Sequence, residues 1–212
     1  MIRFDGRKLT EVRPIRKVNN LILSASSSIQ LSFGTTTVLV AIFNSLVPEK
    51  GGKKFNLEFD SFDQICYPEV INLCKLSTDI MIGEQLKFLI EYQLTINIFL
   101  IEDDGNLVIV LLNAISQSLK EIRVLRSKEI IFSGFGVGRP KKEIFFDPSK
   151  LELKLIQEEL YYAIIFDSTT QKLKFYQIMM SIKEGSQKIT LDKKNIQKLI
   201  LELGFYLFKI FN

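Results

Sequence analysis

The chain has 212 residues, 47% of them hydrophobic, and its 28 basic and 24 acidic side chains leave a net charge of +4. This composition is typical of a globular protein, and the positive excess is too small to predict a dedicated nucleic-acid-binding polycation. There is no histidine, and the two cysteines are Cys66 and Cys74. The composition therefore argues against a disulfide framework and excludes a histidine-based zinc site or a catalytic pair that needs histidine.

The N-terminus, "MIRFDGRKLTEVRP", is charged from its third residue and lacks the apolar core of a secretory signal. The longest apolar runs, such as Leu107 to Leu112, are far shorter than the roughly 20 residues that span a bilayer. We therefore expect a soluble intracellular protein with reduced thiols and no membrane contact.

The first half of the chain predicts strands and then a helix. Between Val12 and Val47, runs rich in Val, Ile, Leu, Phe and Thr are separated by turn residues, which indicates three or four short strands. A further strand is expected at Phe55 to Phe59. Pro68 suits the first turn of a helix, and apolar residues at near 3-4 spacing predict that this helix runs from about Glu69 to Glu91.

The central stretch, "TINIFLIEDDGNLVIVLLNAI", predicts a strand, a turn and a helix. Apolar residues at nearly consecutive positions indicate that the strand is buried on both faces. After the turn at Asp103-Asp104-Gly105, apolar residues repeat at three and four, which predicts a helix with one buried face that ends near Glu121. The acid-glycine turn suits phosphate or metal chemistry, but without histidine or a third converging acid a plain structural turn is favoured over a metal site.

The remainder predicts four strands and a closing helix with Asp192 as its N-cap. The strands are expected at Glu129 to Val137, Lys142 to Phe146, Glu159 to Phe166 and Lys172 to Ile182. The helix is expected from about Leu191, with an apolar stripe of Ile196, Leu199, Ile200, Leu203, Leu207 and Ile210. This order predicts a single α+β domain over residues 1–212.

Two basic loops and the N-terminal segment are the candidates for RNA contact. Lys53 and Lys54 in "GGKKF", and Arg139, Lys141 and Lys142 in "GRPKK", could touch a phosphate backbone, with solvated charged loops as the alternative. For Arg3, Asp5 and Arg7 the alternatives are RNA contact, packing on a neighbouring subunit and capping of local structure.

Four stretches, in order, resemble the RNase PH family, which includes bacterial phosphorolytic exoribonucleases and the RNase PH-like subunits of the exosome ring. They cover most of the chain. The stretches are "RFDGRKLTEVRPI", "SASSSIQLSFGTTTVLVAIF", "INIFLIEDDGNLVIVLLNAISQSL", and "FFDPSKLELKL" followed by "LYYAIIFDSTTQKLKF".

The resemblance implies an RNase PH-like fold of the ribosomal-protein S5 domain 2 type, assembled as a six-subunit ring around an RNA channel. The family reaction is attack of inorganic phosphate on the 3′ terminal phosphodiester, with release of nucleoside diphosphates. Such chemistry needs cationic groups to hold phosphate and carboxylates to bind Mg²⁺ or to move protons.

In active members the turn is followed by glycine, then threonine or serine, then arginine, and these side chains help to hold phosphate. Alignment on Gly105 and on Asn113-Ala114 places Asn106 at the hydroxyl position and Leu107 at the arginine. No arginine occurs between Val18 and Ile122, where the family has further phosphate-binding arginines.

The family's late catalytic aspartate corresponds to Glu158, Glu159 or a neighbour such as Tyr161, depending on register. For the two glutamates the alternative interpretation is a solvated strand edge.

The leading hypothesis is a non-catalytic subunit of the exosome ring, of the short RNase PH-like group, with no cofactor or metal. It would form the RNA channel, meet sister subunits and cap subunits, and serve RNA processing and degradation, including that of ribosomal RNA, in nucleus, nucleolus and cytoplasm. The alternatives are an active phosphate-dependent 3′-5′ exoribonuclease and an RNA-binding protein of the same fold outside a ring.

Overall fold

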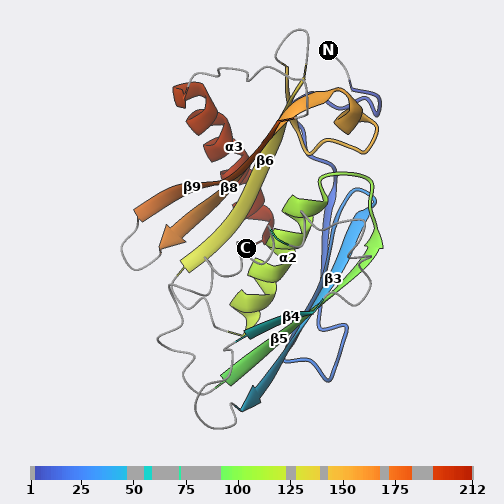
Figure 1. Ribbon diagram of the computed structural model, residues 1–212, viewed down its shortest axis with the longest axis vertical. Helices are drawn as coiled ribbons and strands as arrows, with labels where there is room; N and C mark the ends of the chain where they lie inside the picture. Colours follow the sequence, from blue (N-terminus) through green and yellow to red (C-terminus); the bar gives the residue numbers. More distant parts are fainter. Residues whose placement is uncertain are drawn as a thin grey trace.

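The computed structural model describes residues 3–46, 55–58, 72, 92–122, 128–138, 143–167, 172–182 and 193–211. Within them, two β-sheets enclose helix α2, and helix α3 covers the other face of the second sheet (Figure 1). Buried residues from both sheets and both helices form one hydrophobic core. Of the predicted helix at Glu69 to Glu91 only Asn72 is described, and it is helical; the rest of that helix and the predicted N-cap Asp192 lie outside the described residues.

The first sheet has the strand order β1-β2-β3-β5-β4. Its neighbours pair antiparallel, except that β4 runs parallel to β5. The strands predicted in the first half of the chain are confirmed. They are β1 (Ile15–Asn19), β2 (Ser27–Phe33), β3 (Thr36–Leu46), β4 (Phe55–Glu58) and β5 (Tyr92–Glu102).

Strand β5 differs from its prediction in burial. Leu94, Ile96 and Ile98 are buried, whereas Thr95 and Asn97 between them are partly exposed and Ile101 is exposed. The prediction that this strand is buried on both faces was therefore wrong. Helix α2 packs on only one face of this sheet.

The second sheet has the order β7-β6-β8-β9 and is antiparallel throughout. All four strands predicted in the second half of the chain are confirmed, although three of them begin at other residues than expected. They are β6 (Lys128–Gly138), β7 (Ile144–Phe146), β8 (Ile156–Asp167) and β9 (Lys172–Ile182), with a short 3-10 helix, η2 (Glu152–Lys154), before β8.

Helix α2 (Leu107–Glu121) ends where the periodicity predicts, but the prediction of one buried face was wrong. Every residue from Leu107 to Leu119 is buried. The reason is that α2 contacts β2 and β3 on one side and β6 on the other, as expected for a helix that is apolar around most of its circumference.

Helix α3 (Lys193–Phe211) carries most of the predicted apolar stripe. Ile200, Leu203 and Leu207 are buried, and Ile196 and Leu199 pack against the core. At the C-terminal end Phe211 is buried in place of Ile210, which is 37% exposed.

Asn113 attaches α2 to an open edge of β6. Its amide nitrogen donates to the carbonyl oxygens of Ile109 and Phe132, at 2.8 Å each, and its amide oxygen accepts from Phe132 N at 3.0 Å. Phe132 lies beyond the end of β7, which pairs with β6 only over Phe135 to Val137. The asparagine therefore stands in for the missing neighbouring strand.

Asn113→Ala is expected to lower the free energy of unfolding by roughly 2–4 kcal/mol, because it leaves a buried N–H and a buried carbonyl of Phe132 without partners. Urea unfolding would measure the change. Ser116→Ala is the matched control, since it removes a single bond to Ile130 O and should cost about 1 kcal/mol. Equal costs for the two variants would contradict the assigned role of Asn113.

Candidate functional site

The turn between β5 and α2, residues 103–106, is held by hydrogen bonds within the turn and to the side chain of Thr36. Asp103 Oδ1 accepts from Gly105 N at 3.0 Å. The Thr36 hydroxyl donates to Gly105 O at 2.7 Å and accepts from Asp104 N at 3.0 Å. Gly105 and Asn106 have φ values of 93° and 57°, so the chain reverses through left-handed conformations.

The carboxylate of Asp147, 1% exposed, lies at the start of α2 and binds Arg13 and Asn106. Arg13 donates from Nε to Oδ2 at 2.9 Å and from Nη2 to Oδ1 at 2.8 Å. Arg13 N donates to Oδ2 and Asn106 Nδ2 to Oδ1, both at 2.8 Å. Burial alone would raise the pKa of Asp147, but the bonds and charge of Arg13 outweigh it and hold that pKa below its usual value.

Arg13 also reaches the turn. Nη1 donates to the carbonyl and carboxylate oxygens of Asp104 at 2.9 and 3.2 Å, and Nη2 donates to Gly105 O at 3.1 Å. With the two bonds to Asp147, the five N–H groups of this guanidinium make five internal hydrogen bonds. Arg13 therefore joins the β5–α2 turn to the segment after β7 and has no donor left for a ligand.

The Arg3 guanidinium, like that of Arg13, makes all its hydrogen bonds within the chain. Its guanidinium forms a two-bond ion pair with Glu152 and also donates to carbonyl oxygens of Glu11, Phe146 and Asp147, again five bonds. Burial tends to raise the pKa of Glu152, and the bonds from Arg3 and from Ser149 N reverse that shift and lower it.

The more exposed Arg7 pairs with Asp5 at 2.6 Å and donates to Glu11 O at 3.0 Å. For the N-terminal segment the structure therefore supports capping of local structure, because its arginines are bound to the chain itself.

The two positions of the predicted degenerate phosphate site lie side by side at the start of α2. The Asn106 amide is bound to Asp147, and Leu107 is 6% exposed within the hydrophobic core. The positive end of the helix dipole would favour an anion here, but the buried carboxylate of Asp147 is already bound at this end. Arg13 pairs with Asp104 and Asp147, and Arg7 Nη1 lies 3.4 Å from Asp147 Oδ2, so these four side chains together carry no net positive charge to attract phosphate.

Glu158 and Glu159 lie on opposite faces of β8, because successive side chains alternate along a strand. Glu159 shares its face with Tyr161, the face that packs on α2. Burial, and then the adjacent Glu159 carboxylate, raise the pKa of the Tyr161 phenol above its ordinary value. Glu158 is 1% exposed, and β8 is an inner strand between β6 and β9. The interpretation of Glu158 as a solvated residue at a strand edge was therefore wrong.

The RNA-contact candidates Lys53, Lys54, Arg139, Lys141 and Lys142 lie outside the described residues and stay predictions. Among the residues with a described placement, no three His, Cys, Asp or Glu side chains converge as metal ligands. In the same part of the chain no helix is long and apolar enough to cross a membrane.

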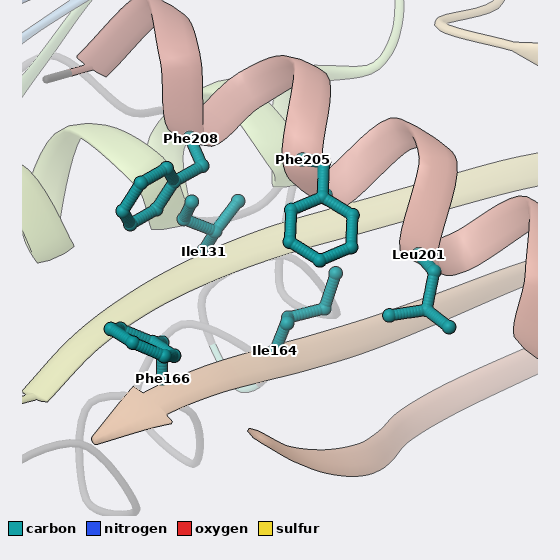
Figure 2. A pocket seen from close by; sticks show the side chains of 7 residues that line it. Ile131, Ile164, Phe166, Leu201, Phe205 and Phe208 are labelled. Carbon is teal, nitrogen blue, oxygen red and sulfur yellow. The ribbon is translucent and has the colours of Figure 1, made fainter. Parts of the chain in front are cut away.

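A hollow of about 120 Å³ lies between α3 and the second sheet. Figure 2 shows Phe205 above Ile164, with Phe208 beside Ile131, so that aromatic and aliphatic groups face one another across the space. Its lining is Ile131, Ile164, Phe166, Leu201, Gly204, Phe205 and Phe208. No side chain in this set carries a charge or a hydrogen-bonding group, so the hollow is unsuited to phosphate or to base recognition.

Arg13 and Asp147 are the central residues that sequence reasoning missed as a pair. Both fall within stretches that resemble the family, in "EVRPI" and "FFDPS". They are 134 residues apart, and no local pattern links them.

The structure resembles solved exosome structures over nearly its whole length. Rice (Oryza sativa) Rrp46 superposes with a TM-score of 0.69 and 16% identity, covering 99% of this chain and 98% of that one. A chain of the Archaeoglobus fulgidus exosome with RNA bound to the active site gives 0.70 and 16%, covering 100% and 93%. A chain of an archaeal exosome core gives 0.69 and 17%, covering 99% and 91%.

No protein-family model and no curated protein matches the sequence. At these identities the likeness establishes the fold. The predicted α+β, RNase PH-like fold is therefore confirmed.

Proposed function

We propose that this chain is a non-catalytic structural subunit of an exosome ring of RNase PH-like proteins. In this role it helps to form the RNA channel and serves 3′-5′ RNA processing and degradation, including that of ribosomal RNA, in nucleus, nucleolus and cytoplasm. The proposal is supported by the fold, which this chain shares over at least 99% of its length with rice Rrp46 and with chains of archaeal exosomes.

One observation carries the non-catalytic part of the proposal: the position expected to hold a phosphate-binding arginine is a leucine inside the core. Leu107 offers no donor, and the amide of Asn106 is engaged by Asp147. Arg13, whose guanidinium reaches the turn, is saturated by internal bonds. A phosphoryl-transfer site needs donors aimed at the reacting phosphate, and none of these three side chains at the start of α2 supplies one.

The proposed partners are sister RNase PH-like subunits in a hexameric ring, cap subunits, and RNA in the channel. Large apolar side chains stand exposed on several parts of the described surface, which supports burial against other chains. They include Leu151 and Leu155, which flank η2, and Phe205 and Tyr206 on α3; Phe4, Leu23 and Ile101 are exposed elsewhere.

Purified protein incubated with a 3′-unstructured RNA, Mg²⁺ and inorganic phosphate is expected to release no nucleoside diphosphate above a no-enzyme blank. An active phosphorolytic exoribonuclease assayed in parallel is the positive control. Phosphate-dependent release would support the alternative, an active exoribonuclease. Its loss in Glu159→Gln, but not in the exposed-surface variant Glu102→Gln, would then assign the acid to β8.

Assembly is tested separately by native mass spectrometry after co-purification from the source cells. The proposal predicts a complex with sister subunits of similar mass. A stable free monomer that retains RNA would instead support an RNA-binding protein of the same fold outside a ring.

A further inference from the structure

A second hollow, of about 260 Å³, lies between the N-terminal segment and α3. Its floor is apolar and buried, and its rim is exposed and polar. The residues of this groove are Thr10, Glu11, Val12, Phe146, Glu202, Leu203 and Tyr206.

The rim of the groove is acidic on both sides. Glu11 comes from the N-terminal segment and Glu202 from α3, so the two carboxylates border one hollow from opposite ends of the chain. Tyr206, 47% exposed, adds an aromatic face, and Phe146 and Leu203 form the buried floor. The volume is below the roughly 300–1,000 Å³ of small-molecule sites, so it fits one or two side chains rather than a cofactor or nucleotide.

From this chemistry we propose that the groove binds an arginine-bearing segment of a partner protein. A guanidinium is planar, stacks on an aromatic ring and donates to carboxylates in pairs, and the hollow is lined by the Tyr206 ring together with Glu11 and Glu202. The aliphatic stem of the arginine would cover Phe146 and Leu203, which are otherwise open to the hollow. The same carboxylates repel RNA phosphates, so this face is suited to protein rather than to nucleic acid.

The described cations close to the rim leave both carboxylates accessible. Lys198 approaches Glu202 at 4.0 Å, but both side chains are largely exposed, and such exposed helix pairs contribute little. Arg3 and Arg7 donate to the backbone carbonyl of Glu11, not to its carboxylate. The Glu11 carboxylate accepts from the backbone N of Lys8 at 2.9 Å.

The test is an NMR titration of the full-length, isotope-labelled protein with the capped dipeptide acetyl-Leu-Arg-amide. The matched control peptide carries citrulline, which has the shape of arginine without its charge. We expect saturable shifts at Leu203 and Tyr206, an affinity about fivefold weaker for the citrulline peptide, and weaker binding at high salt. The double variant Glu11→Gln/Glu202→Gln should lose about the same factor, while Glu102→Gln should not.

Equal affinity for both peptides would overturn the proposal, because an apolar contact alone would then explain binding. Shifts confined to other surfaces, or unchanged by the double variant, would overturn it equally. Since both glutamates are exposed, the variants should keep the wild-type circular dichroism spectrum and melting temperature, so that a loss of binding reports on the groove itself.

Discussion

Asp147→Ala is expected to lower the free energy of unfolding by about 3–5 kcal/mol, the range observed when one partner of a buried ion pair is removed. The variant would leave the buried Arg13 guanidinium with only the more exposed Asp104 carboxylate as an ion-pair partner and would take a partner from the Asn106 amide. It would also leave Arg13 N without its acceptor. Urea or guanidinium unfolding, followed by circular dichroism, measures the loss.

Two further variants separate the charge from the shape of this side chain. Asp147→Asn keeps an oxygen acceptor, and asparagine tolerates the φ of 45° at this position, so a smaller loss is expected than for alanine. Asp5→Asn is the surface control, because the Asp5 carboxylate is 42% exposed beside Arg7 and should contribute at most about 1 kcal/mol. Similar losses for Asp147→Ala and Asp5→Asn would contradict a central role for Asp147.

The buried carboxylates of Asp147 and Glu152 predict that the folded protein loses stability in acid. In the folded state the pKa values of Asp147 and Glu152 are lowered, because bonds to Arg13 and Arg3 outweigh burial. Their contribution to stability is therefore complete above the unfolded pKa values of about 4 and is lost as the pH falls through the folded values. The stability of Asp147→Asn should fall less steeply below about pH 4 than that of the wild type.

Most strands were predictable because their signal is local. Alternating apolar residues mark one buried face, and antiparallel partners are close in sequence, as in the β2–β3 hairpin, where Phe33 pairs with Thr36. The burial of α2 was not predictable in this way. Ser116, Gln117 and Ser118 lower its apparent hydrophobicity although all three are buried, and Ile130, to which Ser116 donates, belongs to a sheet that follows later in the chain.

At the candidate site, the lack of a phosphate-binding side chain could be predicted from the sequence, whereas the buried ion pairs could not. The position of Leu107 follows from alignment on the glycine and asparagine landmarks alone, and the structure places that leucine in the core. The ion pairs of Arg3 and Arg13 could not be predicted, since their partners lie 149 and 134 residues away. Arg3 and Arg7, for which RNA contact was one alternative, are bound to other residues of the chain in the fold.

Gly105→Ala is expected to cost roughly 3 kcal/mol or more, for two additive reasons. The φ of 93° is a conformation that alanine adopts only with strain, worth about 1–2 kcal/mol. A Cβ would also lie 2.6 Å from both Lys150 N and Pro148 O, which are backbone atoms that cannot rotate away. The turn and the segment after β7 would have to separate, and the bond from Lys150 N to Asp104 O, 2.8 Å, would be lost.

Gly6→Ala is the matched control for Gly105→Ala, since Gly6 has a similar φ of 82° but no atom within 4 Å of the place where the added methyl group would lie. It should show the conformational cost alone, and the difference between the variants in urea unfolding measures the steric contact at the turn. Because Arg13 donates to Gly105 O and to Asp147, separation at this point would also weaken the buried ion pair. Gly105→Ala combined with Asp147→Ala should therefore cost less than the sum of the two single changes, whereas strict additivity would show that turn and ion pair are independent.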